Sequence, residues 1–597
     1  MVSTFYGFSI TMRALMAAQK GLEITAHNIA NANTPGYSRQ RPEFVTGPAI
    51  MFPGMNRPGG VPLNLGGGVD VRSVNRMRDV YLDHIIRNST SDSGFFLAKE
   101  TGFSKLEVIM NEPSETGLSS MITNLFNSFA DLSNNPEMTS ERANVMEKGL
   151  NLAEKFNQFD SELKSTRAKQ NRSISLSVNE VNNILNQIGN LNKQIIASEG
   201  VGDQPNDLKD TRDLLLDRLS ELINIDTIDK DNGDVAVIIN GITVVDKDNI
   251  VHLETRIKPD TTNGDLEIYY DVGLKVKITS GEILGYVKLR DEIIPEYENR
   301  LNRLASSMMN RINYQHRKGY GLDELSGRPF FNDYVTATMS STVTFPPGTT
   351  LDTPIDELGI TAGTFYIQNT KIEITREDVT PAEAITLGDV LEKINMEQPW
   401  VRASLNDDHT GTRIQLDLYN PPDVSETIHL YKGTSNFLTT VTGMMDADVV
   451  STETARIYTN AMDMISVSLA LRDNLDVIAA AYKDEFNDFS GAGDNTNALN
   501  LAELNDMMNA VDNSSFTDYY NSIIGSLGSQ AQTNDSQVIN QGMLLGQLEN
   551  QKLQISGVSI DEEALNMIQY QRAFEGAARV SSTLDSMIET IIFGLGA

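Results

Sequence analysis

The chain contains no cysteine, and this absence excludes several kinds of site. Without thiols there are no disulfide bonds, no zinc–thiolate sites and no cysteine nucleophiles. The six histidines are scattered, and none falls in a His-Glu-x-x-His pattern, which argues against a zinc hydrolase. We therefore expect the fold to depend on its buried core and on its neighbours.

Long apolar runs and basic charge are also scarce. No run reaches membrane-spanning length, and the first residues lack the basic, apolar and small-residue regions of a cleaved secretory signal. Lys and Arg number 48 and Asp and Glu 81, giving a net charge of −33. Such a charge repels nucleic acid and anionic membranes. We expect neither as a partner, and either a cytoplasmic location or export without cleavage.

The sequence also lacks catalytic motifs. It has no Gly-x-Ser-x-Gly elbow and no Gly-Lys-Ser/Thr phosphate loop. Asp229 and Asp231 have calcium-loop spacing, but the loop departs from the pattern at its fifth and sixth positions, and Asn240 replaces the bidentate glutamate. A solvated turn is favoured. We predict no catalytic residues, no metal site, no cofactor and no enzymatic activity.

The N-terminus has the pattern of an amphipathic helix. Apolar residues recur at spacings of three and four from Phe5 to Ile29, with one polar position at Gln19. This is the pattern of a coiled-coil seam. The seam residues that we expect to act in assembly are Phe8, Met12, Leu15, Leu22 and Ile29.

The C-terminus repeats this pattern. Ser559 and Glu562 fit a capping box at the start of the predicted helix. Neither terminal helix can bury its stripe alone. We expect the two helices to pair with each other or with copies of themselves, although ordinary core helices would show the same pattern. The C-terminal assembly seam is predicted to comprise Met567, Tyr570, Phe574, Leu584, Ile588 and Ile591.

A length of 597 residues is too great for one core, so several domains are expected. We predict an α+β multidomain fold with paired, coiled-coil-like terminal helices, an elongated helical bundle and inserted β-rich domains. The terminal domain takes in residues 1–36 and 557–597. The helical domain takes in 37–334 and 456–556, with a small β insertion at about 226–281 and a loop at 490–500. Residues 335–455 form a β-rich outer domain.

In the stretch "AHNIANANTPGYSRQ", residues 26–40, residues typical of turns follow directly on a helical pattern. Pro35 ends helical propagation, and Gly36 is suited to the positive φ of a type II turn. Asparagine amides satisfy backbone groups freed at the helix end. A plain helix stop is the simpler alternative. The motif comprises Asn28, Asn31, Asn33, Pro35, Gly36 and Tyr37.

This motif, placed after an apolar N-terminal helix, closely resembles the signature of bacterial flagellar axial proteins, the rod, hook and hook-associated subunits. The C-terminal stretch "SGVSIDEEALNMIQYQRAFEGAARV" resembles the closing helix of that family. Its Asp561-Glu562-Glu563 run resembles the hook-associated subunits, as do "PNDLKDTRDLLLDRLSELINI" and the stretch from Ser280 to Asp323. The resemblance covers both termini and residues about 85–330, and it does not cover 335–455.

The resemblance implies a structural subunit of the extracellular flagellum at the junction of hook and filament. It implies type III export, a chaperone that binds the C-terminal helix, and assembly into a ring of copies. The ring would contact hook protein on one side and a second junction protein on the other. Alternatives are a large hook or distal-rod protein, or an axial protein that carries an adhesin or enzyme domain at 335–455.

Overall fold

The computed structural model describes residues 4–51, 64–259, 264–333, 335–367, 370–375, 385–397, 401–408, 411–419, 428, 430–446, 450–451, 461–482, 489–508 and 510–594. Long helices and several small antiparallel sheets make up the described residues, so the predicted α+β multidomain class is confirmed. No helix among them combines the length and apolarity needed to cross a bilayer.

The chain divides into two compact units. The first unit contains residues 1–102, 170–288 and 533–597, and the second contains 103–169 and 289–532. Three helices pass from one unit into the other along the sequence: α2 (Val80–Met110), α4 (Thr139–Gly200) and α12 (Phe516–Ser556). The two units are described separately below.

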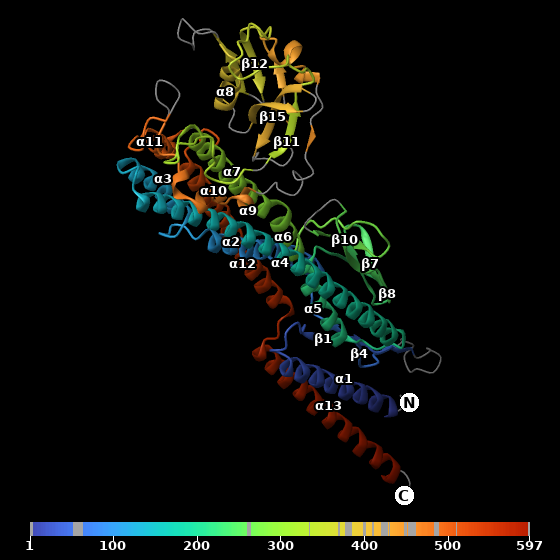
Figure 1. The fold of residues 1–597 in the computed structure, drawn as a ribbon. Helices are drawn as coiled ribbons and strands as arrows, with labels where there is room; N and C mark the ends of the chain where they lie inside the picture. The colour runs from blue at the N-terminus through green and yellow to red at the C-terminus, as the bar shows by residue number, and fades with distance from the viewer. Residues whose placement is uncertain are drawn as a thin grey trace. The chain divides into compact units, whose positions relative to one another are not determined.

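Both chain ends belong to the first unit. Helix α1 (Thr4–Ala30) packs along helix α13 (Ile560–Gly594), and the two lie side by side in Figure 1. The backbone N–H of Glu562 donates to the hydroxyl of Ser559 (3.4 Å), so the predicted start of the C-terminal helix is confirmed. Since an isolated helix of this length is marginal in water, the mutual packing stabilises both.

A β-ribbon follows α1. Strand β1 (Gln40–Thr46) pairs antiparallel with β4 (Val69–Arg76), with a register shift between Glu43 and Phe44. The short strands β2 (Ile50–Met51) and β3 (Asn64–Leu65) also pair. Residues 37–334 had been predicted to be helical apart from 226–281, and this ribbon corrects that prediction. Apolar and polar residues alternate only weakly along its strands, which also contain Pro42 and several charged residues. The two-residue period typical of a strand is therefore hard to detect in this sequence.

The rest of the first unit packs helices against small sheets. Asn240 and Gly241 both have positive φ (46° and 79°) and form the tight turn between β6 and β7, which an Asn-Gly pair favours. The second half of α4 and helix α5 share a core with these strands, centred on residues such as Val237, Leu219 and Tyr270. The remaining elements are α5 (Asn206–Leu222), β5 (Asp226–Asp229), β6 (Val235–Ile239), β7 (Ile242–Asp246), β8 (Asn249–Ile250), β9 (Leu253–Ile257), β10 (Leu266–Tyr270) and α6 (Glu282–Lys288).

The second unit is built on the first half of α4, the start of α12, and the helices α3 (Leu118–Asn134) and α7 (Ile294–Lys318). Pro295 lies in the first turn of α7, where proline is tolerated. Phe126 stacks on Phe516, with ring centroids 5.8 Å apart. The buried Arg142 donates to the carbonyls of Pro136, Leu475 and Ile478, which ties α4 to the returning chain.

The returning chain of the second unit is less regular than predicted. Its described residues include the short helices α9 (Ala461–Met464), α10 (Leu469–Asp473) and α11 (Thr496–Glu503) before α12. Helix α11 begins inside the stretch 490–500 that was predicted to be a loop. Asp494 accepts hydrogen bonds from the backbone N–H and the hydroxyl of Thr496 (3.1 and 2.6 Å), so the polar residues of this stretch cap a helix.

The segment between α7 and α9 has a hydrophobic core of its own, in which Phe365 stacks on Phe437. One sheet has the order β14-β15-β11-β17 and the other β13-β12-β16. The stretch "LGDVLEKIN" forms most of the one α-helix that the described residues of this segment show, α8. The bounds are β11 (Val335–Ser340), β12 (Gly363–Ile367), β13 (Thr370–Ile374), α8 (Leu387–Glu397), β14 (Val401–Asp408), β15 (Gly411–Tyr419), β16 (Leu430–Lys432) and β17 (Val450–Ser451).

Candidate functional site: the junction after the N-terminal helix

Asn28, in the last turn of α1, is the centre of the junction. Its side chain is only 1% exposed. Nδ2 donates to the carbonyl of Gln40 (2.9 Å) and to the carboxylate of Glu563 (3.0 Å). Oδ1 accepts from the backbone N–H of Gln40 (3.0 Å) and from the hydroxyl of Tyr37 (2.7 Å). All four hydrogen-bonding positions of the amide are therefore filled, and they join α1, the start of β1 and α13.

The chain reverses after α1 through the predicted turn. The backbone N–H of Tyr37 donates to the carbonyl of Thr34 (3.2 Å), and Gly36 has a φ of +78°, as position i+2 of a type II turn requires. Asn31 Nδ2 donates to the carbonyl of His27 (3.1 Å), which also accepts the backbone N–H of Asn31, and Asn31 Oδ1 accepts from the hydroxyl of Thr34. Within the motif, therefore, Asn28 and Asn31 bond the backbone as expected.

The other motif residues differ in exposure. Asn33, Pro35 and Gly36 are exposed, while Tyr37 is half-buried. A Cβ at Gly36 would lie 3.4 Å from the Cβ of Leu214, so the turn rests on α5. The turn therefore touches the body of the unit although most of it faces solvent.

Tyr37 connects the helix end to α5. Its hydroxyl lies 3.0 Å from His27 Nδ1, and His27 Nε2 lies 3.6 Å from the carboxylate of Asp207. Burial and the carboxylates of Asp207, Asp210 and Glu563 raise the pKa of Tyr37, so its phenol stays protonated and remains a donor.

Arg39 connects the motif to the start of α13. Its guanidinium bonds Glu562 (2.7 Å) and Glu563 (2.8 Å), and its backbone N–H donates to the carbonyl of Ser556 (2.9 Å). Glu563 is buried, and it is neutralised by Arg39 and bonded by Asn28. The acidic run predicted from resemblance thus meets the asparagine motif in space, more than 500 residues away along the chain.

The face that α1 presents to α13 is not the predicted seam. A Cβ at Gly21 would lie 2.8 Å from the ring of Tyr570, and one at Gly7 would lie 3.3 Å from Leu584. Small or polar residues therefore allow the close approach, and they repeat at spacings of four and three. They are Gly7, Thr11, Ala14, Ala18, Gly21, Thr25 and Asn28.

The predicted N-terminal seam lies about 100° round the helix from this small-residue face. Phe8 is 38% exposed and Met12 46%, while Leu15, Leu22 and Ile29 are half-buried. On α13, Met567, Tyr570, Leu584 and Ile588 are half-buried, Phe574 is exposed, and the side chain of Ile591 lies outside the described residues. The N-terminal seam lies off the close contacts that α1 makes with α13 at Gly7 and Gly21, because hydrophobic periodicity ignores glycine and alanine. As a contact between copies, it stays a prediction.

A network of ion pairs supports the ribbon beside the junction. Arg76 bonds Asp210 (2.8 Å) and Asp213 (2.7 Å), and Arg78 bonds Asp213 (2.6 Å) and also Asp83. Burial alone would raise the pKa of Asp213, but the guanidinium groups of Arg78, Arg76 and Arg87 outweigh it and lower that pKa. The spacing of Asp210, Asp213 and Asp217, which places them on one helix face, is the sequence signal that could have revealed this network.

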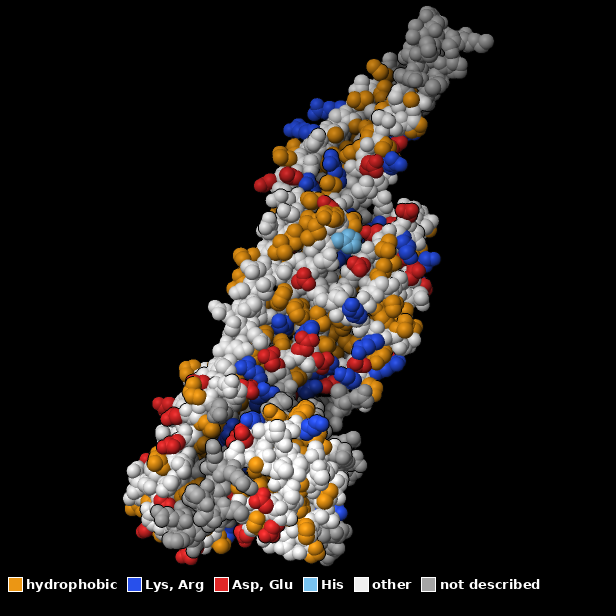
Figure 2. All heavy atoms as spheres, turned by 90° about the horizontal axis from the view of Figure 1, so that it is seen from above, with side chains coloured by type: hydrophobic (Ala, Val, Ile, Leu, Met, Phe, Trp, Pro, Cys, Tyr) orange, Lys and Arg blue, Asp and Glu red, His pale blue; other side chains and the backbone are white. Residues whose placement is uncertain are grey.

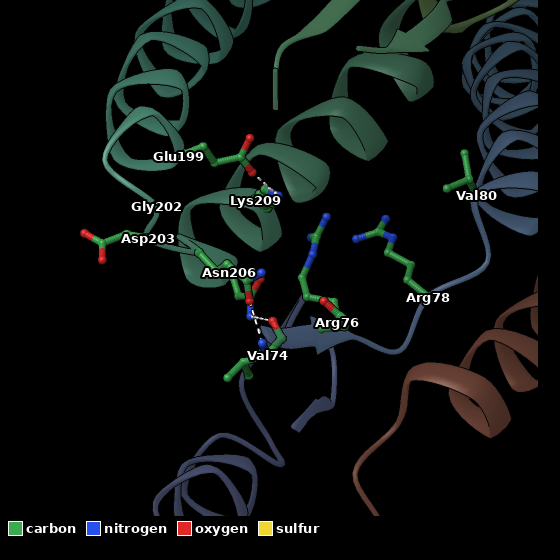
Figure 3. Close-up of a pocket in the computed structure, with 11 residues that line it drawn as sticks. Val74, Arg76, Arg78, Val80, Glu199, Gly202, Asp203, Asn206 and Lys209 are labelled. Carbon is green, nitrogen blue, oxygen red and sulfur yellow. Dashed lines mark hydrogen bonds and ion pairs between the residues drawn. The ribbon is translucent and has the colours of Figure 1, made fainter. Parts of the chain in front are cut away.

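The same network reaches α2 and α12. Arg87 bonds Asp217 (2.8 Å), and Lys552 lies 3.5 Å from Asp83 and 3.3 Å from Asp217. A pocket of about 500 Å³ opens beside it, lined by Arg76, Arg78 and Lys209 among others, and Figure 3 shows Lys209 paired with Glu199. The lining cations have carboxylate partners, so this pocket is not a ready anion site.

The described residues contain no group of three or more His, Asp or Glu side chains placed to hold a metal ion. On the face drawn in Figure 2, acidic and basic side chains lie interspersed. The junction holds α1, β1 and α13 together through the fully hydrogen-bonded amide of Asn28 and several charge-assisted hydrogen bonds.

Comparison with known proteins identifies what this junction belongs to. Residues 8–37 match the family model "Flagella basal body rod protein", and 549–592 match "Flagellar basal body rod FlgEFG protein C-terminal". Residues 103–331 match "Flagellar hook-associated protein FlgK helical domain". Flagellar hook-associated protein 1 of Bacillus subtilis (strain 168) is 28% identical over 603 residues, covering 100% of this chain and 99% of the relative.

The chain is a homologue of flagellar hook-associated protein 1.

A second relative of the same name, from Escherichia coli (strain K12), is 25% identical over 598 residues, covering 97% of this chain and 98% of the relative. Among solved structures, "The structure of the flagellar hook junction protein FlgK from Burkholderia pseudomallei" matches with a TM-score of 0.53 and 16% identity. It covers 79% of this chain and 100% of that chain, which shows a shared fold. These matches confirm the prediction of a structural flagellar subunit of the hook–filament junction.

The helical-domain match favours the hook-associated prediction over the alternative of a large hook or distal-rod protein. The hook-associated protein 1 homologue shares its two ends with rod proteins and its helical middle with hook-associated ones. The junction at Asn28 lies within the residues that match the rod-protein model.

Proposed function

We propose that this homologue of hook-associated protein 1 forms a ring of copies between the hook and the filament of an extracellular bacterial flagellum. Similarity from end to end to hook-associated protein 1 carries this proposal. The role is mechanical. The terminal helices and the Asn28 junction give each copy a fixed connection between its two chain ends and its body.

The contacts between copies involve the apolar residues that the helix pair leaves uncovered. Phe8 and Met12 on α1 and Phe574 on α13 are exposed in the single chain. Exposed apolar residues at regular spacing are typical of an interaction surface. Burial of this seam against neighbouring copies would stabilise the assembled form over the free subunit.

The ring contacts hook protein on one side and a second junction protein on the other. The subunit reaches this place through the flagellar type III export apparatus, and a chaperone holds the C-terminal helix before export. In support of a chaperone, α13 exposes Leu565, Ile568 and Val580 along with Phe574. Such a helix invites aggregation unless it is covered.

We assign three domains to these tasks. Residues 1–36 and 557–597 form the inner tube domain, 37–334 and 456–556 the helical body, and 335–455 a β-rich outer domain. None of these is assigned an enzymatic role. The outer domain adds surface to the subunit, and an adhesin or enzyme at 335–455 remains the alternative.

Localisation in the assembled organelle tests the proposal. An epitope tag in an exposed loop, detected with gold-labelled antibody on purified flagella, should mark a single band where hook meets filament. Label spread along the hook would favour the hook-protein alternative, and label absent from purified flagella would contradict the proposal.

A further inference from the structure

The C-terminal half of α12 carries an apolar stripe that faces away from its own unit. Ile539, Met543 and Leu553 are each more than half exposed. Together with Gly546 and Asn550 they recur at spacings of four, three, four and three, which places them on one side of the helix.

The opposite side of this helix segment is anchored, so the direction of the stripe is fixed. Asn534 donates to the carbonyl of Phe96 (3.0 Å), and Gln541 accepts from Ser89 (3.2 Å). Leu548 is buried among the apolar residues of α2. The stripe lies about 160° round the helix from these contacts.

Two glycines destabilise this part of the helix, and no contact within the single chain explains their presence. Gly542 and Gly546 lie in the helix interior, and a Cβ built on either meets no atom within 4 Å. Glycine in a helix interior is less stable than alanine. A missing Cβ does let another backbone approach closely, so a partner that packs against the stripe would account for both residues.

Charge indicates the nature of that partner. From Tyr519 to Leu548 the sequence carries one charged residue, Asp535, although 22% of the whole chain is charged. A partner of opposite charge would be attracted by a group of acidic residues, and this stretch carries only Asp535. Two copies of a chain with net charge −33 repel each other, and they meet at least cost where both lack charge.

We propose that the stripe Ile539–Met543–Gly546–Asn550–Leu553 docks on a second copy of this chain. This inference rests on the proposed function, because it assigns one surface to the contacts within the ring. The surface belongs to the body of the subunit, so it adds to the contacts made by the terminal helices.

The test uses a photo-crosslinking benzophenone amino acid in place of Met543, with the same substitution at Gln551 as the matched control. Both positions are exposed on the same helix, and Gln551 lies off the stripe. Flagella are purified from cells that carry each variant and are then irradiated. We expect Met543 to yield a crosslink between two copies of this chain and Gln551 to yield none.

A crosslink from Met543 to a different polypeptide, or no crosslink from a chain that is present in the flagella, would overturn the inference. Absence of the chain from purified flagella would instead contradict the proposed function. As a second measurement, Met543→Glu should weaken self-association of the full chain about ten-fold or more, and Gln551→Glu should leave it unchanged. Equal association of both variants would also overturn the inference.

Discussion

At the scale of single residues, the junction depends on the difference between an amide and a carboxylate. Asn28 both donates and accepts, and it does so toward the backbone of Gln40 and the carboxylate of Glu563. A carboxylate of the same shape would keep the two acceptor contacts and lose both donors. The motif therefore requires asparagine at this position for a physical reason.

Asn28→Asp should open the junction. Two buried acceptors lose their donor, and a second carboxylate is placed beside Glu563, at a cost of about 2–4 kcal/mol. The amide of Gln40 should then exchange with solvent about 30-fold faster or more. Asn33→Asp, in the same motif but exposed, is the control and should leave the exchange rate unchanged. Equal rates in the two variants would show that Asn28 does not hold the junction.

A second residue-scale prediction concerns His316 in the second unit. Its Nδ1 donates to the carbonyl of Arg328 (2.8 Å), and its Nε2 accepts from the backbone N–H of Ala479 (3.0 Å). Burial lowers the pKa of His316 from 6.5 to about 4, with smaller contributions from Arg317 and Arg142. The folded state therefore holds the neutral ring, which the unfolded chain protonates below pH 6.5.

Stability of the second unit should be full above pH 6.5 and should fall as the pH drops from 6.5 to about 4. The loss should reach about 3 kcal/mol, at 1.36 kcal/mol for each unit of pKa difference. Urea unfolding at several pH values measures it. His316→Gln should be less stable at pH 7 and should lose this part of the pH slope. An unchanged slope in His316→Gln would assign the effect to other groups.

At the scale of elements, the helix pair α1 and α13 is specified by residues that carry little hydrophobic signal. Periodicity located both helices, because large apolar residues recur on each. It did not identify Gly7 and Gly21, where α1 closely approaches α13, since glycine carries no hydrophobic signal. Composition and spacing therefore predict the presence of a helix more reliably than they predict which of its faces is buried.

Gly21→Ala should loosen the helix pair, because the new methyl group would lie within 3.0 Å of the Tyr570 ring. Overpacking costs about 1–3 kcal/mol and outweighs the gain in helix propensity. Gly576→Ala, on α13 and facing open space, is the matched change and should stabilise by up to about 1 kcal/mol. Hydrogen exchange across α13 should move in opposite directions. Equal shifts would refute the close contact.

Some elements are specified by short-range signals in the sequence. Helix α7 and the turn at Asn240-Gly241 follow from local signals: apolar periodicity with Pro295 in the first turn, and the Asn-Gly pair. The β1–β4 ribbon and the pairs between Arg76 and Asp213 depend on partners far apart in the chain. A single sequence holds no sign of which distant arginine meets which aspartate, so this part of the site required the structure.

At the scale of the whole molecule, the chain combines a strong negative charge with several places where that charge is absent or neutralised. In the Asn28 junction Arg39 pairs with both Glu562 and Glu563, and the α12 stripe contains no charged residue. A subunit that assembles needs both features. Repulsion between negatively charged copies limits premature association, and surfaces without unpaired charge permit association in the assembled form.

We expect this chain to connect hook to filament, and deletion of its gene removes that connection. Hooks should still assemble, filaments should be missing, and flagellin should accumulate in the culture medium. Electron microscopy of the cells and a flagellin blot of the supernatant measure both outcomes, with a plasmid copy of the wild-type gene as control. Deletion cells that bear filaments of normal length, with no flagellin released, would show that this chain does not connect hook to filament.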